Sequence, residues 1–148
     1  MNEEMKSYIL CIKNTHKLHT NTGAPGSTVL AAFLFSLSTA GCRPSTDGSC
    51  SLVKFADDTQ LVGKNCNDED APYHKQTENC VNWCDNNYLY LDVFKTKEMC
   101  FDFRKNQRCP KPVYIKEEAV GRVGTYKYLG VVFDSELNWK ENIKSVLK

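Results

Sequence analysis

The apolar positions along the chain follow helical spacing in three places and strand spacing in several others. A nearly continuous apolar run between a Gly-Pro loop and Gly41 predicts a helix over about 29–39. Acidic residues followed by Pro72 suit the first turn of a second helix, which the pattern ends at Asn86-Asn87. The apolar spacing of residues 139–148 predicts a third helix.

Strand composition is found between and after these helices. Residues 51–56 and 59–63 are β-rich runs on either side of Asp57 and Asp58, which predicts a hairpin. Residues 99–104 alternate apolar and polar positions, as in a strand with one buried face. Residues 113–115 and 126–133 are also strand-like, whereas residues 1–20 predict no element. This mixture predicts an α+β fold.

Length and charge narrow the class of protein. The 148 residues are enough for one domain, at ~100–200 residues per domain. With 19 basic and 18 acidic residues, the chain has a net charge of +1. This excludes an acidic disordered chain and a protein whose whole surface is basic enough to bind phosphate. We see no signal peptide and no apolar segment near the ~20 residues that a membrane helix needs. We therefore expect an intracellular protein without a membrane partner, in a compartment that the sequence does not identify.

The eight cysteines also need an interpretation. Without a signal peptide, reduced and mostly buried thiols are favoured over disulfides. Cys80 and Cys84 are the one close pair, and their helical spacing also suits buried small side chains. Zinc sites usually have tighter pairs, so no zinc is expected.

Asp57 and Asp58 are the sharpest chemical feature of the sequence. Adjacent carboxylates at a tight turn repel each other, and a divalent cation would relieve that repulsion. Mg²⁺ prefers carboxylate and phosphate oxygens, and a pair of such ions can promote phosphoryl transfer. A solvated turn is the simpler interpretation of an isolated Asp pair, and the flanking strands alone do not displace it.

Four segments, taken in order, resemble the reverse transcriptase of non-LTR (LINE-type) retrotransposons. Residues 23–35 are similar to the family's G-x-P-Q-G-x-x-L-S-P-x-L-F segment, and residues 55–58 to its (Y/F)-x-D-D catalytic hairpin. Residues 91–99 are similar to its L-N-x-x-K-T-x-x-M stretch, and residues 126–130 to its F-x-Y-L-G hairpin. The resemblance covers residues 18–148 and leaves residues 1–17 as an unmatched N-terminal segment.

The resemblance implies a partial polymerase palm, truncated at both ends. The implied fold is a small antiparallel sheet with the Asp57-Asp58 hairpin at its centre and helices on one face. The implied activity is RNA-directed DNA polymerisation with Mg²⁺, or Mn²⁺, as cofactor. The implied partners are nucleotides, an RNA or DNA primer–template, and the remainder of the polymerase.

The family's functional residues map onto matching positions. Asp57 and Asp58 resemble its metal-ligating carboxylates. Lys95 would lie near the incoming nucleotide and assist the leaving pyrophosphate, although a surface lysine explains it equally well. The loop toward template and nucleotide and the primer grip correspond to Gly23, Pro25, Gly26 and Ser27, and to Tyr128, Leu129 and Gly130. A buried strand with a bulge at Gly130 is the other interpretation of the last segment.

The chain departs from the family in ways that bear on activity. The family needs a further Asp on a strand upstream of the Gly-Pro loop, but no Asp precedes Asp47 here. We therefore expect that strand and the fingers region to be absent. Gly26 and Ser27 also stand where the family has Gln-Gly. A metal site that lacks one carboxylate loses charge and geometry together, so the chain is expected to be inactive alone.

Two alternatives remain at this point. Residues 104–116 contain no acid and carry basic residues that a nucleic-acid backbone would attract: Arg104, Lys105, Arg108, Lys111 and Lys116. A solvated hairpin connection explains the same run. Residues 126–139 also resemble a small module named for the N-terminus of AlkB-like tRNA-modifying proteins. Its chemistry does not carry over, because the sequence has neither an H-x-D motif nor a Gly-rich cofactor loop.

Overall fold

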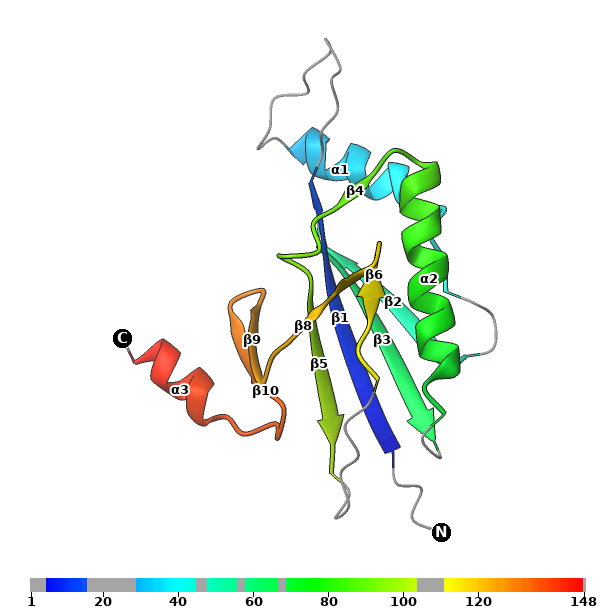
Figure 1. Cartoon of the computed structure of the whole chain (residues 1–148). Helices are drawn as coiled ribbons and strands as arrows, with labels where there is room; N and C mark the ends of the chain where they lie inside the picture. The colour runs from blue at the N-terminus through cyan, green and yellow to red at the C-terminus, as the bar shows by residue number, and fades with distance from the viewer. Residues whose placement is uncertain are drawn as a thin grey trace.

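A computed structural model describes residues 5–15, 29–44, 48–55, 58–66, 69–103 and 111–147. Its framework is a sheet with one long helix, α2 (Ala71–Asn86), along one face (Figure 1). The strands lie in the order β2 (Cys50–Phe55), β3 (Asp58–Cys66), β1 (Met5–Thr15), β5 (Lys97–Asp102) and β8 (Gly121–Arg122). Only the short β5–β8 pair is parallel among the pairs described. The predicted α+β class with a small antiparallel sheet is confirmed.

β1 is the central strand, and it overturns three expectations. It pairs with β3 from Met5↔Cys66 to Lys13↔Asp58, and with β5 along its other edge. The prediction of no element in residues 1–20 is therefore wrong, as is the expected absence of a strand upstream of the Gly-Pro loop. The β2–β3 hairpin lies at an edge of the sheet rather than at its centre. Because β1 has only one short apolar patch, its pairing with two neighbours defines it better than its own composition does.

The other predicted elements are confirmed with small shifts at their ends. The hairpin around Asp57-Asp58 is β2 and β3, which pair as far as Phe55↔Asp58. The first and third predicted helices are α1 (Val29–Ser38) and α3 (Lys140–Val146). The second is α2, with Pro72 in its first turn. The remaining strands are β4 (Tyr90–Leu91), β6 (Tyr114–Ile115), β7 (Glu118–Ala119), β9 (Thr125–Tyr128) and β10 (Val131–Asp134).

The hydrophobic core lies between α2 and the sheet. Leu61 of β3, Leu91 of β4 and Ile115 of β6 are almost completely buried there. α2 contributes a face of buried residues, namely Tyr73, Gln76, Thr77, Cys80, Val81 and Cys84. The prediction of mostly buried thiols is confirmed for the described cysteines: Cys42, Cys50, Cys80 and Cys84 are buried and Cys100 is half-buried.

The C-terminal hairpin and α3 lie on the other side of the sheet from α2, so the expectation that the helices lie on one face is wrong (Figure 1). Tyr126 and Phe133 of this hairpin meet Gln60 and Met99 of the sheet around a gap of about 40 Å³. α3 packs on β10, and its apolar side chains remain exposed. Among the helices that the structure describes, none combines the length and apolar character needed to cross a membrane.

Candidate polymerase-like site at the hairpin end of the sheet

The Asp hairpin lies at the end of the sheet where β2 meets β3. Asp58 is the first residue of β3, half-buried, and pairs in the register with Phe55 of β2 and Lys13 of β1. Asp57, the residue for which the resemblance implies the main metal-ligating role, lies outside the described residues. The same end of the sheet carries the last residues of β1, where Asn14 and β4 pair.

The described residues do not fit a two-metal centre. β1 contains neither Asp nor Glu, so the strand beside the hairpin contributes no carboxylate. The residue opposite Asp58 in the strand register is Lys13, which is not a ligand that a divalent cation takes. No group of three potential ligands from His, Cys, Asp and Glu occurs in the part of the chain that the structure describes.

Lys95 lies in the turn between β4 and β5, at the same end of the sheet as Asp58. β5 begins here, with Lys97 opposite Cys11 of β1. Because neighbouring strands are ~4.8 Å apart, β5 lies about 10 Å from β3. The Lys95 side chain is 66% exposed and forms an ion pair of 3.4 Å with Asp92. The structure thus brings Lys95 to the same end of the sheet as the Asp hairpin, on a neighbouring turn.

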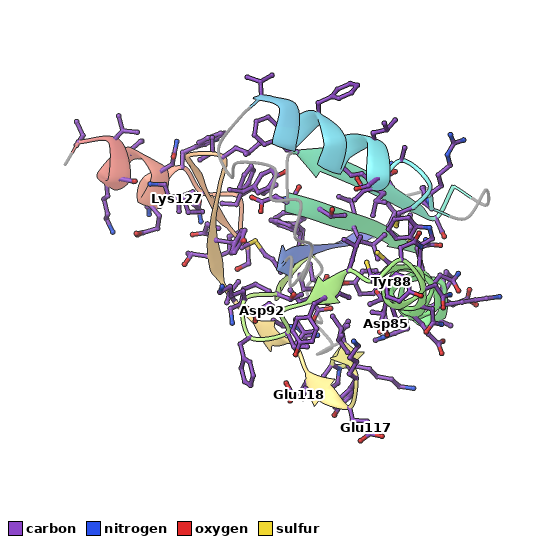
Figure 2. The ribbon with its side chains drawn as sticks, turned by 90° about the horizontal axis from the view of Figure 1, so that it is seen from above. Asp85, Tyr88, Asp92, Glu117, Glu118 and Lys127 are labelled. Atoms are coloured by element: carbon purple, nitrogen blue, oxygen red, sulfur yellow. The ribbon has the colours of Figure 1, made fainter. Side chains whose placement is uncertain are left out.

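The Lys95 turn is held by two residues that the sequence reasoning did not single out. One carboxylate oxygen of Asp92 accepts a hydrogen bond of 3.1 Å from the Lys95 backbone N–H. The buried hydroxyl of Thr96 donates to the Asp92 carbonyl at 2.7 Å. Figure 2 labels Asp92 in this turn. The sequence could have indicated both roles, because Asp and Thr side chains commonly form hydrogen bonds with nearby backbone groups in turns.

The loop implied to face template and nucleotide is not among the described residues: Gly23, Pro25, Gly26 and Ser27 all precede α1. α1 itself presents exposed apolar side chains at a spacing of four, Val29, Phe33 and Leu37. The segment that follows α1 is fastened to β2, because the Lys54 ammonium donates to the Cys42 carbonyl at 2.7 Å.

The segment implied to be a primer grip forms the β9–β10 hairpin. Leu129 and Gly130 make its two-residue turn with φ values of 47° and 87°. Positive φ at both positions is the type I′ geometry that matches the twist of hairpin strands. The interpretation as a buried strand with a bulge at Gly130 is therefore wrong. Tyr128 is half-buried, and Leu129 projects from the turn with 53% exposure.

The basic run is only partly described. Arg104, Lys105 and Arg108 lie outside the described residues, and Lys111 is exposed. Lys116 forms an ion pair of 2.6 Å with Asp85 on α2 and lies 5.4 Å from the ring centre of Tyr90. Figure 2 labels Asp85 on α2 and Glu117 in the turn between β6 and β7 that Lys116 joins to it. Lys116 thus ties this turn to α2 instead of extending toward a phosphate backbone.

Comparison of the chain with protein-family models, with curated proteins and with solved structures found no match. For the AlkB-like alternative, the structure adds only that His74 lies on α2, since His16 and His19 are outside the described residues.

Proposed function

We propose that the chain is a partial palm of a non-LTR reverse transcriptase that does not catalyse nucleotidyl transfer by itself. The observation that carries the proposal is the arrangement at the hairpin end of the sheet. An Asp-bearing hairpin lies beside a strand from upstream of the Gly-Pro loop, and the Lys95 turn lies two strands away. These are the relative positions that the sequence resemblance implies for a catalytic hairpin, its neighbouring strand and a nucleotide-side lysine.

Inactivity follows from the charge on that neighbouring strand. The resemblance requires a carboxylate from a strand upstream of the Gly-Pro loop. β1 is a strand at that place, but it has neither Asp nor Glu and carries Lys13 opposite Asp58. A lysine at this register position supplies no negative ligand for a divalent cation. Asp57 and Asp58 would then bind Mg²⁺ or Mn²⁺ weakly, as an incomplete set of ligands. Any polymerase activity would require the remainder of the enzyme.

Primer extension on an RNA template, with Mg²⁺ or Mn²⁺, tests the inactivity. We expect the wild-type chain to incorporate no more nucleotide than Asp57→Ala. Incorporation by the wild type that disappears in Asp57→Ala would refute the claim of inactivity.

A metal titration tests whether the hairpin end is the ion site. Lys13→Asp adds the missing carboxylate opposite Asp58, and we expect Mn²⁺ affinity to rise about tenfold, a gain of ~1.4 kcal/mol. Lys64→Asp is the matched control, because it makes the same change on β3, opposite Ser7 and six residues from Asp58. Equal changes in Mn²⁺ affinity for the two variants would argue against a palm-like metal site.

Nucleic-acid backbone binding by residues 104–116 is a second candidate function. It is favoured by the exposure of Lys111 and of the Tyr114 ring at the described end of the basic run. Phosphate contacts of this kind weaken as salt concentration rises. We expect RNA binding to be salt-dependent and to be lost in the triple alanine variant of Arg104, Lys105 and Arg108.

The matched control for that variant removes three exposed lysines elsewhere: Lys64, Lys75 and Lys127. We expect this control to bind RNA nearly as well as the wild type. Equal losses in both triple variants would mean that only net charge matters. Binding that does not respond to salt would exclude backbone recognition by the basic run.

A further inference from the structure

Two cysteine thiols from distant parts of the sequence lie close together, one just after α1 and the other on α2. Cys42 follows α1, and Cys80 lies on the buried face of α2, 38 positions later. Their Sγ atoms are 3.8 Å apart, and both residues are more than nine-tenths buried. A disulfide has an S–S distance of ~2.05 Å, so the two sulfurs are in van der Waals contact and must approach by about 1.8 Å to form the bond.

A small cavity lies beside the two sulfurs. Its volume is about 10 Å³, and its lining includes Cys42, Cys80, Lys54 and Thr59. That is about the space of one water-sized molecule. The Lys54 ammonium reaches this place from β2, where it donates to the backbone carbonyls of Thr39 and Cys42. A water-sized space thus lies against the Lys54 side chain and both thiols.

The two thiols differ in acidity. The hydrogen bond from Cys80 and the positive charge of Lys54 lower the pKa of Cys42 to about 7, although burial opposes this. The pKa of Cys80 is raised, first because its thiol is hydrogen-bonded to Cys42 and Cys84, and then by burial. Thiolates are the reactive form of cysteine, so Cys42 is the nucleophile of the pair and Cys80 keeps its proton.

We propose that Cys42 and Cys80 are a peroxide-reactive thiol pair that closes to an intramolecular disulfide. The Cys42 thiolate attacks one oxygen of hydrogen peroxide, so that an S–O bond forms, the O–O bond breaks and hydroxide leaves. The Cys80 sulfur then attacks the Cys42 sulfenic acid. An S–S bond forms, the S–O bond breaks, and the oxygen leaves as water with the Cys80 proton. The two sulfurs together lose two electrons, which the peroxide gains.

The bond would constrain the part of the fold that carries the Asp hairpin. It closes a loop from Cys42 to Cys80 that contains both β2 and β3. It also fixes the segment after α1 to α2. The reaction of this thiol pair would be the same whether or not the chain is a polymerase palm.

Peptide mapping of the folded, reduced wild-type chain after treatment with hydrogen peroxide tests the proposal. Free thiols are alkylated before digestion, and the expected product is a Cys42–Cys80 crosslinked peptide that a dithiol reductant removes. The rate of its formation should rise with pH, with a midpoint near 7. Peroxide-treated protein that lacks this crosslink, or that carries a different cysteine pair in its place, would overturn the proposal.

Three variants sharpen the test. Cys80→Ser should stop the reaction at a Cys42 sulfenic acid, which a dimedone probe traps. Lys54→Met should slow the oxidation several-fold at pH 7 and move the midpoint to higher pH. Cys100→Ser is the control and should leave the product unchanged, because burial raises the pKa of the half-buried Cys100 thiol to about 11. An unmodified Cys42 beside an oxidised Cys100 would contradict the assigned order of reactivity.

Discussion

The side of the sheet covered by α2 and the C-terminal unit of β9, β10 and α3 are built very differently. On the α2 side, Leu61, Leu91 and Ile115 are at most 1% exposed. Across residues 123–147, all of which are described, no residue is buried. Buried apolar area is the main favourable term in folding. The free energy of unfolding is therefore concentrated in the α2-side core, and the C-terminal unit contributes little to it.

Charged groups show the same contrast. Glu98 of β5 is buried, accepts hydrogen bonds of 2.9 and 2.7 Å from Arg122, and is reached by the Tyr73 hydroxyl at 3.2 Å. Lys144 and Glu141 of α3 form an ion pair of 2.6 Å on an exposed helix surface. A buried charge depends on its partner, whereas an exposed pair is screened by solvent. Ion pairs of similar length therefore have different effects on stability in the two regions.

The largest expected difference comes from deleting apolar side chains. Leu61→Ala should lower the free energy of unfolding by about 2–5 kcal/mol, because it leaves a cavity in the closed core. Ile143→Ala, on the exposed face of α3, should cost less than about 1 kcal/mol. Urea unfolding of the two variants measures both values. Equal losses would show that α3 is buried in solution.

Removing the partner of the buried carboxylate should have the next largest effect. Arg122→Met leaves Glu98 without its cation and should cost about 2–3 kcal/mol, at the low end for buried pairs since the Arg122 side chain is 29% exposed. Lys144→Met removes the cation of the exposed pair and should change stability by less than about 0.5 kcal/mol. Thermal melting at neutral pH measures the loss of stability in each of the two variants. If Arg122→Met melts at the same temperature as the wild type, water reaches Glu98.

The smallest expected contrast is between two glycines. A Cβ at Gly63 would lie 2.5 Å from a ring carbon of Tyr73, so Gly63→Ala should overpack the core by about 1–3 kcal/mol. A Cβ at Gly124 would approach only the Ser135 hydroxyl at 4.0 Å, so Gly124→Ala should be nearly neutral. The denaturant midpoints of the two variants measure this difference. A destabilisation at Gly124 as large as that at Gly63 would contradict the open packing of the C-terminal unit.

Local patterns in the sequence predicted the elements that depend on neighbouring residues. The three helices and the hairpin around Asp58 have apolar spacing, helix-starting or helix-ending residues, or turns, all of which act within a few positions. β1 was missed because a central strand receives its hydrogen bonds from residues far along the chain. The hydrogen bonds of Asp92 were also missed, although Asp is a common turn residue.

The candidate site likewise has features that the sequence determined and features that only the tertiary structure decided. The sequence by itself determined which chemical groups exist: an Asp pair, Lys95, a basic run and a β1 strand without a carboxylate. Only the tertiary structure decided which of them meet. It set Lys13 opposite Asp58, brought the Lys95 turn to the same end of the sheet and engaged Lys116 with Asp85. It also brought two thiols 38 positions apart to 3.8 Å, because strand pairing and helix packing join residues whose separation along the chain gives no sign of their contact.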